Sequence, residues 1–166
     1  MYGLHCHTVM KILTYKLNIM LDSLPGIKLF DLSKKTAIVT GGSKGLGLAM
    51  AAGLASAGAN LLIVNRNEKD GFIIAEKIAK TYGVKALAFA ADISKEEQTD
   101  AMAAFAMENF GSIDILINSA GINIRGAIDE VSLEDFNKVM EVNVTGSWLC
   151  SRSVIPHMKA QKSGKI

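Results

Sequence analysis

A glycine-rich loop between a β-branched run and an alanine-rich run constrains this sequence more than any other feature. Thr36–Thr40 is a short apolar run of the kind found in buried strands, and 40–47 reads Thr-Gly-Gly-Ser-Lys-Gly-Leu-Gly. From Leu46 to Ala57, apolar residues then recur at helical spacing. Glycines at a strand-to-helix turn permit tight turning and let backbone amides approach a phosphate. The sequence therefore predicts an anion-binding loop at this junction.

Beyond this loop, short apolar runs alternate with longer runs of helical periodicity. After the strand at 36–40, further strands are predicted at 60–65, 85–90 and 113–117, with the start of a fifth at 164–166. Strands that are apolar on both faces and separated by helices indicate a parallel sheet covered on both sides. The expected fold class is α/β: a doubly wound parallel sheet of the Rossmann type, incomplete, with strand order 3-2-1-4 and only the beginning of a fifth strand.

Capping residues predict where the later helices begin and end. Asn67 is a favourable N-cap, and Gly83 can end the helix that follows it. Ser94–Glu97 reads Ser-Lys-Glu-Glu, which predicts a capping box at the start of the next helix. A second capping pattern at Ser132–Asp135 is expected to open a long helix that reaches about Met158.

Charge and hydropathy exclude two classes of partner. Lys and Arg number 18 against 16 Asp and Glu, and a net charge of +2 is too small for a nucleic-acid-binding surface. No apolar stretch approaches the roughly 18 residues that span a bilayer, so no membrane interaction is expected. A chain of 166 residues has the length of one domain, which we expect at 31–166 after an N-terminal appendage or extension at 1–30.

The cysteines and the N-terminus favour a cytoplasmic protein. Cys6 and Cys150 cannot form a disulfide framework, and neither belongs to a C-x-x-C pair. The first residues have neither the compact apolar core of a secretory signal nor the arginines of a transit peptide. His5–His7 places two histidines around Cys6, but alternate neighbours at a chain end rarely close a metal site, so no metal is expected.

The spacing of the glycines distinguishes a loop that binds a dinucleotide from one that binds a nucleoside triphosphate. Gly42 and Gly47 have the spacing of a nucleoside-triphosphate loop, but Leu48 and Ala49 stand where that loop needs lysine followed by serine or threonine. The free amides and positive end of the following helix suit the pyrophosphate of a dinucleotide. A methyltransferase loop, which also carries glycines after a first strand, stays an alternative.

Two motifs together resemble the short-chain dehydrogenase/reductase family. They are the spacing G-x-x-x-G-x-G over Gly41–Gly47, preceded by Thr40, and Asn-Ser-Ala-Gly over Asn118–Gly121. The resemblance covers roughly 29–166. Within the family, the sequence most resembles gluconate 5-dehydrogenase-like and 3-oxoacyl-carrier-protein reductase-like members. It implies an NAD(P)-dependent oxidoreductase that transfers hydride between a nicotinamide cofactor and a carbonyl or alcohol substrate. It also implies a homodimer or homotetramer of the full-length parent, assembled through the long helix.

No carboxylate stands where dinucleotide folds usually hold the ribose 2′-hydroxyl. About 20 positions past the glycines lies Asn65, and Arg66 follows it. A guanidinium can pair with a 2′-phosphate, and Lys44 in the loop supplies a second cation. We therefore expect NADP as the cofactor, with NAD possible.

Position and resemblance together identify the expected cofactor-binding residues. Asp92 and Ile93 follow the third strand and match the aspartate–apolar pair that the family places beside the adenine ring. Asn118 is implied to hold the fourth strand and to line the cofactor ribose, with Ser119 in place of the family's more usual asparagine. The expected set is Thr40, Gly41, Ser43, Lys44, Gly45, Leu46, Gly47, Arg66, Asp92, Asn118, Ala120 and Gly121.

One amide interrupts an apolar stripe predicted on the long helix. Phe136, Met140, Asn143, Ser147 and Val154 fall on one helical face. An unsatisfied buried amide costs about 1–3 kcal/mol, so Asn143 either bonds to nearby backbone or belongs to a site. The segment Asn-Val-Thr-Gly that begins there resembles the family's catalytic asparagine region. The resemblance implies that Asn143 bends the helix and holds a water of the proton relay.

The remainder of the family's catalytic set is missing from the sequence. The family uses a tyrosine as general acid or base, a lysine four residues later and a serine that orients the substrate. None of Tyr2, Tyr15 and Tyr82 is followed four residues later by lysine. We interpret the chain as the N-terminal, cofactor-binding part of such an enzyme, inactive by itself. The alternative is a short product that binds a dinucleotide or a partner without catalysis.

Overall fold

The computed structural model describes residues 29–166. The chain divides into two units, Met1–Asp31 and Leu32–Ile166, and the description below concerns the second. The predicted appendage at 1–30 lies outside the described residues except for its last two positions, and so does the His5–His7 tract.

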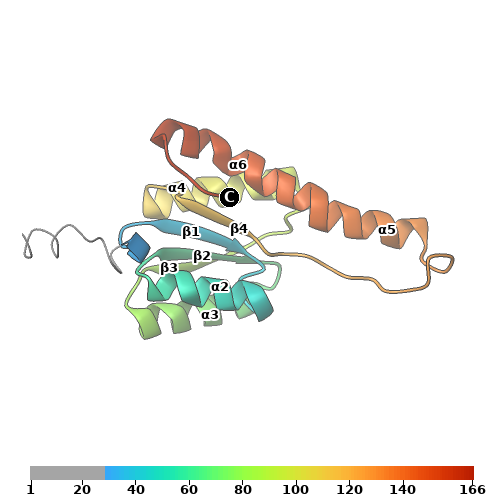
Figure 1. Cartoon of the computed structure of the whole chain (residues 1–166), viewed down its shortest axis with the longest axis horizontal. Helices are drawn as coiled ribbons and strands as arrows, with labels where there is room; N and C mark the ends of the chain where they lie inside the picture. The colour runs from blue at the N-terminus through green and yellow to red at the C-terminus, as the bar shows by residue number, and fades with distance from the viewer. Residues whose placement is uncertain (1–28) are drawn as a thin grey trace, which may run out of the picture. The chain divides into compact units, whose positions relative to one another are not determined.

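The second unit is a four-stranded parallel sheet with helices between the strands (Figure 1). In chain order the elements are β1 (Thr36–Thr40), α2 (Gly45–Ser56), β2 (Asn60–Asn65), α3 (Glu68–Tyr82), β3 (Ala86–Ala90), α4 (Glu96–Phe110), β4 (Ile115–Asn118), α5 (Leu133–Met140), the π-helical segment η2 (Glu141–Thr145) and α6 (Gly146–Gln161). The strand order is β3-β2-β1-β4, and every pair is parallel. The predicted fold class and strand order are therefore confirmed.

Successive residues of the central strands point into two separate cores. Ile38, Leu62 and Leu116 pack against α4 and α6, whereas Val39 and Ile63 pack against α2 and α3. All five are completely buried, as strands of a doubly covered parallel sheet should be. Figure 1 shows the two pairs of helices on opposite faces of the sheet.

The predicted beginning of a fifth strand is also present, beside β4. Lys165 forms a parallel bridge with Ile115. Its amide donates to the carbonyl oxygen of Asp114 at 2.9 Å, and its own carbonyl oxygen accepts from the amide of Leu116 at 2.9 Å. This single bridge lies at the place where the order 3-2-1-4-5 of a doubly wound fold puts a fifth strand, beside the four strands of the sheet.

Helix α2 packs on the sheet through its smallest residues. Gly47, Ala51 and Ala55 form its buried face, whereas Leu46 is 80% exposed and Met50 is 38% exposed. The predicted helix is confirmed, but of the larger residues in the periodic run (Leu46, Met50 and Leu54) only Leu54 packs against the core, as a partly buried side chain. Small side chains allow the closer approach of helix to strand that the loop before α2 needs.

Two of the predicted helix caps are confirmed. Asn67 accepts a hydrogen bond from the amide of Asp70 at 3.2 Å, and α3 ends at Gly83 in the left-handed conformation. The hydroxyl of Ser132 accepts from the amide of Asp135 at 3.0 Å and donates to its carboxylate at 2.8 Å. These are local interactions, which explains why the sequence alone predicts them.

The predicted capping box at Ser94–Glu97 is wrong. Helix α4 begins at Glu96 with Lys95 as its N-cap, and no side chain caps it. The hydroxyl of Ser94 instead donates to the carboxylate of Asp92 at 2.8 Å. The amide of Ser94 also donates to that carboxylate at 3.0 Å, so both bonds hold Ser94 in the turn before Lys95, one residue before the N-cap position.

The predicted long helix is present but is not uniform. It runs through α5, η2 and α6, and the π-helical turn η2 contains Asn143. The predicted buried stripe is wrong at this end, because Asn143 is exposed and Phe136 and Met140 are 53% and 41% exposed. Figure 1 gives the reason: α5 extends past the edge of the sheet, so no strand lies beneath it. Of that stripe, Val154 is fully buried.

Neither a membrane span nor a metal cluster occurs in the described part of the chain. No helix in residues 29–166 has the length and apolar character to cross a bilayer. The same residues contain no group of three or more His, Cys, Asp or Glu side chains arranged to hold a metal ion.

Candidate functional site

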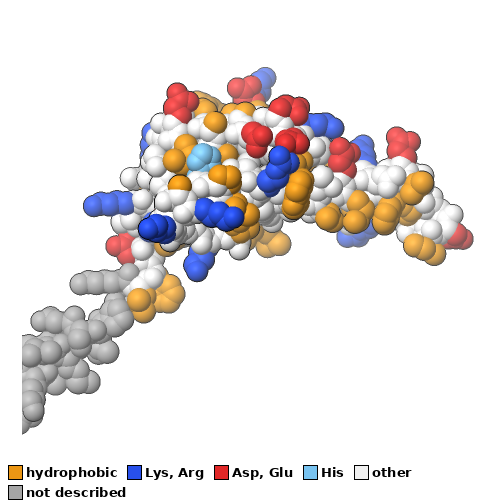
Figure 2. Space-filling view, turned by 90° about the horizontal axis from the view of Figure 1, so that it is seen from above, with side chains coloured by type: hydrophobic (Ala, Val, Ile, Leu, Met, Phe, Trp, Pro, Cys, Tyr) orange, Lys and Arg blue, Asp and Glu red, His pale blue; other side chains and the backbone are white. Residues whose placement is uncertain are grey.

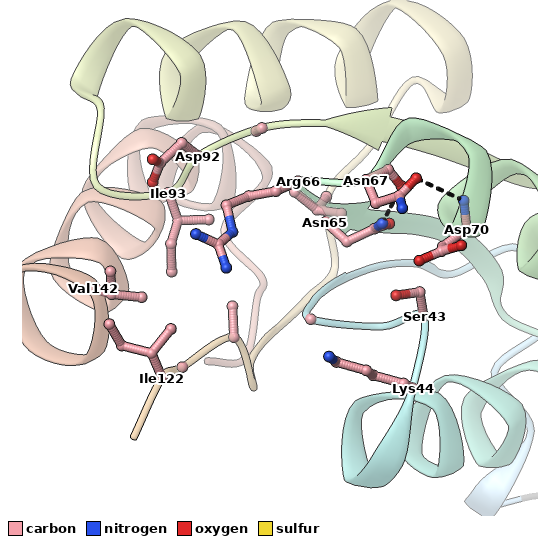
Figure 3. Close-up of a pocket in the computed structure, with 15 residues that line it drawn as sticks. Ser43, Lys44, Asn65, Arg66, Asn67, Asp70, Asp92, Ile93, Ile122 and Val142 are labelled. Atoms are coloured by element: carbon pink, nitrogen blue, oxygen red, sulfur yellow. Dashed lines mark hydrogen bonds between the residues drawn. The ribbon is translucent and has the colours of Figure 1, made fainter. Parts of the chain in front are cut away.

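A cleft of about 210 Å³ opens at the carboxyl edge of the sheet (Figure 3). Its walls come from the loop after β1, the end of β2 and the segments that follow β3 and β4. The lining residues are Gly41, Ser43, Lys44, Val64, Asn65, Arg66, Asn67, Asp70, Ala91, Asp92, Ile93, Ala120, Gly121, Ile122 and Val142. Open α/β sheets bind their ligands at this edge.

Three glycines shape the loop between β1 and α2. Gly41 and Gly45 have φ angles of 67° and 55°, which side chains disfavour. A Cβ on Gly41 would lie 2.8 Å from the Cα of Ala120, and a Cβ on Gly47 would collide with the carbonyl oxygen of Gly41. The close packing of loop, helix and β4 segment therefore depends on these glycines.

The N-terminus of α2 is left without a cap from the protein. Its N-cap, Lys44, makes no side-chain capping bond, and the first turn has no acidic residue. The first amides of a helix lack intrahelical partners, and the helix dipole is positive there. The backbone of Gly45, Leu46 and Gly47 is therefore suited to bind an anion such as a pyrophosphate.

Thr40 joins the loop to the segment after β4. Its hydroxyl donates to the carbonyl oxygen of Ile117 at 3.3 Å. The same hydroxyl oxygen accepts from the amides of Ser119 and Ala120 at 3.1 and 3.2 Å. Thr40 therefore links the loop after β1 to the segment after β4 without itself lining the cleft.

Asn118, at the end of β4, also supports the site. Its Nδ2 donates to the hydroxyl of Ser151 at 3.1 Å, and Ser151 donates to the carbonyl oxygen of Ser147. Its Oδ1 is buried and has no partner among residues 29–166. Asn118 thus connects β4 to α6, and it is not one of the residues that line the cleft.

Asp92 and Arg66 bring opposite charges to the cleft. Burial raises the pKa of Asp92, but hydrogen bonds from the amide and hydroxyl of Ser94 and the positive charges of Arg66 and Lys95 lower it. The net effect places the pKa of Asp92 below its ordinary value. Asp92 is therefore a carboxylate at neutral pH.

An apolar wall faces these charges. Ile93, Ile122 and Val142 line one end of the cleft, and the Arg66 side chain extends toward them (Figure 3). Ile93 directly follows the predicted Asp92, so the sequence contained a signal for it. Ile122 and Val142 lie in different elements, and no local pattern relates them.

Asn143 connects those two elements. Its Oδ1 accepts from the amide of Ile122 at 2.8 Å, and its Nδ2 donates to the carbonyl oxygen of Ile122 at 2.9 Å. A Cβ on Gly121 would lie 3.1 Å from the same Oδ1. Asn143 therefore fixes the cleft wall through backbone hydrogen bonds.

The structure brings about half of the predicted residues into the cleft itself. Those that line it are Gly41, Ser43, Lys44, Arg66, Asp92, Ala120 and Gly121. Those that adjoin it without lining it are Thr40, Gly45, Leu46, Gly47, Asn118 and Asn143. Besides Ile122 and Val142, the lining residues that the sequence did not assign to the site include Asn67 and Asp70, which the helix-cap pattern at α3 could have suggested.

Comparison with known proteins agrees with this arrangement. A family model described as short chain dehydrogenase matches residues 35–166. Glucose 1-dehydrogenase 2 of Bacillus subtilis is 40% identical over 129 residues, which cover 77% of this chain and 50% of that protein. The 2-dehydro-3-deoxy-D-gluconate 5-dehydrogenase of Formosa agariphila is 34% identical over 140 residues, covering 84% and 53%.

Solved structures show the same similarity. L-sorbose reductase from Gluconobacter frateurii, complexed with NADPH and L-sorbose, is 33% identical with a TM-score of 0.76, and the match covers 80% of this chain and 50% of that one. An alcohol dehydrogenase from Thermococcus sibiricus, complexed with 5-hydroxy-NADP, is 29% identical with a TM-score of 0.75, covering 79% and 56%. The chain spans about half the length of the curated relatives it matches. With its glycine loop, sheet order and matched motifs, this chain belongs to the short-chain dehydrogenase family.

Proposed function

We propose that residues 31–166 form the cofactor-binding part of an NAD(P)-dependent oxidoreductase that transfers hydride reversibly between a nicotinamide cofactor and a carbonyl or alcohol substrate. One observation carries the proposal: the uncapped N-terminus of α2 adjoins a cleft whose loop excludes side chains at Gly41 and Gly47. Such a cradle of backbone amides fits a pyrophosphate.

The residues at the cleft fit the rest of a dinucleotide. The amides of Gly45, Leu46 and Gly47 would hold the pyrophosphate. Ile93 and Asp92 would flank the adenine, and Lys44 and Arg66 would favour a 2′-phosphate, so we propose NADP over NAD. The NADPH in L-sorbose reductase and the 5-hydroxy-NADP in the alcohol dehydrogenase support this preference.

The bound cofactor would supply the hydride, and Asn143 is the member of the catalytic set that we assign here. Both atoms of its amide bond to Ile122, so we propose that Asn143 orders the wall beside the reaction site. Among residues 29–166, no tyrosine lines the cleft. We therefore propose that these 166 residues bind cofactor without completing a turnover.

The surface of the long helix supports an assembly role. Leu133, Phe136, Val144 and Trp148 are each more than half exposed, and Figure 2 shows hydrophobic side chains along this segment. We propose that the full-length parent forms a homodimer or homotetramer through it. Burial raises the pKa of the Cys150 thiol to about 12, which keeps this thiol protonated and unreactive at neutral pH.

Calorimetry of the 166-residue chain tests the cofactor proposal. We expect NADPH to bind more tightly than NADH, and S-adenosylmethionine to give no heat. Binding of S-adenosylmethionine alone would favour a methyltransferase-like module. Binding of neither nicotinamide nucleotide by correctly folded chain would reject the proposal.

A further inference from the structure

A carboxylate lines the same cleft as the two cations that the sequence singles out. Asp70 is on the first turn of α3 and lines the cleft together with Ser43, Lys44 and Arg66. Its side chain is exposed, and it forms no ion pair within residues 29–166. The cleft therefore carries a negative charge on its Ser43 side, in addition to the two cations expected to attract a 2′-phosphate.

The backbone around Asp70 is held firmly. Its amide donates to Oδ1 of Asn67 at 3.2 Å, and Nδ2 of Asn65 donates to the carbonyl oxygen of Asn67. Gly71 leaves room for this turn, since a Cβ there would collide with Oδ1 of Asn65. The hydrogen bonds fix the turn between β2 and α3, and so they keep the Asp70 carboxylate at the cleft wall.

The position of Asp70 along the cleft determines which part of a bound dinucleotide would lie near its carboxylate. In dinucleotide folds the ribose 2′-oxygen lies at the end of the second strand, here Asn65 and Arg66. In Figure 3, Asp70 lies on the side of the cleft where Ser43 lies, while Arg66 extends toward Ile93 and Ile122. The carboxylate is therefore nearer to the loop and strand end than to the apolar wall.

A carboxylate at this place treats the two nicotinamide dinucleotides differently. It can accept a hydrogen bond from a free 2′-hydroxyl, and it repels the charge of a 2′-phosphate. We propose that Asp70 is a cofactor-specificity-determining residue, which opposes the preference for NADP that Lys44 and Arg66 create and keeps the cleft open to NAD. This inference rests on the proposed function of the cleft.

Cofactor titrations of the whole chain with Asp70→Asn test it. We expect Asp70→Asn to raise the affinity ratio of NADPH to NADH roughly tenfold, mainly through tighter NADPH binding, because a repulsive charge is removed. Glu68→Gln is the matched control: Glu68 lies on the same helix turn and does not line the cleft. It should change the ratio less than about twofold, since solvent screens its charge.

Binding of two cofactor fragments that differ in the 2′-phosphate measures the effect of Asp70 at that position alone. Adenosine 2′,5′-bisphosphate should gain affinity on Asp70→Asn, whereas adenosine 5′-monophosphate should not. Asp70→Ser is a second variant and should act in the same direction. Equal ratios in the unchanged chain and both Asp70 variants, or an equal shift in Glu68→Gln, would overturn the inference while leaving the proposed function intact. Binding of neither cofactor by the folded, unchanged chain would overturn both.

Discussion

Asn143 and Ile122 pair through two hydrogen bonds of 2.8 and 2.9 Å, in which the side-chain amide of one residue matches the backbone of the other. Asn143 lies in the π-helical turn between α5 and α6, and Ile122 lies in the segment after β4. The pair therefore ties the long helix to the cleft wall. π-Helical turns often occur at functional sites, and here the turn carries the residue that makes this connection.

Asn143→Ala should loosen the cleft wall. The loss of two hydrogen bonds should cost about 1 kcal/mol and leave the amide of Ile122 unprotected. Hydrogen exchange measured by NMR should show faster exchange at Ile122. Asn137→Ala, an exposed asparagine on α5 with no side-chain bond to the cleft, is the control. Unchanged protection at Ile122 would contradict the pairing.

Gly47→Ala should abolish nucleotide binding. Its Cβ would collide with the carbonyl oxygen of Gly41, so the loop must move away from α2. Gly53→Ala lies on the same helix with nothing within 4 Å of the added Cβ. It should therefore bind nucleotide normally and gain about 0.5–1 kcal/mol of stability from the better helix propensity of alanine. Calorimetry and thermal melting compare the two variants, and equal binding by both would refute the steric argument.

Asp114 should make stability depend on pH. Burial raises its pKa, but hydrogen bonds from Lys35, Thr36 and Ser112, at 2.8, 3.0 and 2.9 Å, lower it below the ordinary value of 3.8. Because the pKa of Asp114 is lower in the folded state, its ionised carboxylate stabilises the fold fully at pH values above the ordinary pKa of 3.8. This stabilisation is lost as the pH falls through the folded-state pKa.

Asp114→Asn tests this relation. The variant should be less stable than the unchanged chain by about 2 kcal/mol at neutral pH, with the difference shrinking toward pH ~2. Urea unfolding across that range measures it. Asp100→Asn, which removes an exposed acid on α4, is the control and should change the free energy of unfolding at neutral pH by less than about 0.5 kcal/mol. A difference that stays constant with pH would rule out the proposed origin of the stabilisation.

Two serines at predicted caps should respond differently. Ser132→Ala removes a confirmed cap and should cost about 1 kcal/mol of unfolding free energy. Ser94→Ala removes no cap, but it takes a hydrogen bond from Asp92, and the pKa of that carboxylate should rise. Urea unfolding measures the first effect and NMR titration of Asp92 the second. A loss of about 1 kcal/mol of unfolding free energy in Ser94→Ala would instead support the capping box predicted at Ser94–Glu97.

The sequence predicted the parts of the fold that depend on neighbours along the chain. The strands, the glycine loop after β1 and the caps at Asn67 and Ser132 follow from local patterns, and their order implies a parallel sheet. The capping pattern at Ser94 was wrong because hydrogen bonds to Asp92 hold Ser94 one residue before the N-cap of α4.

Only the tertiary structure decided which distant residues meet. Three features depend on how the crossovers place separate elements. They are the contact of Asn143 with Ile122, the burial of α2 through Gly47 and its alanines, and the meeting of Asp70, Lys44 and Arg66 in one cleft. Periodicity shows that a helix has an apolar face. The position of the sheet determines which residues of the helix are buried against it and where along the helix this burial ends. For that reason the chain's family was evident in its sequence, while the charges and hydrogen bonds of its cleft were not.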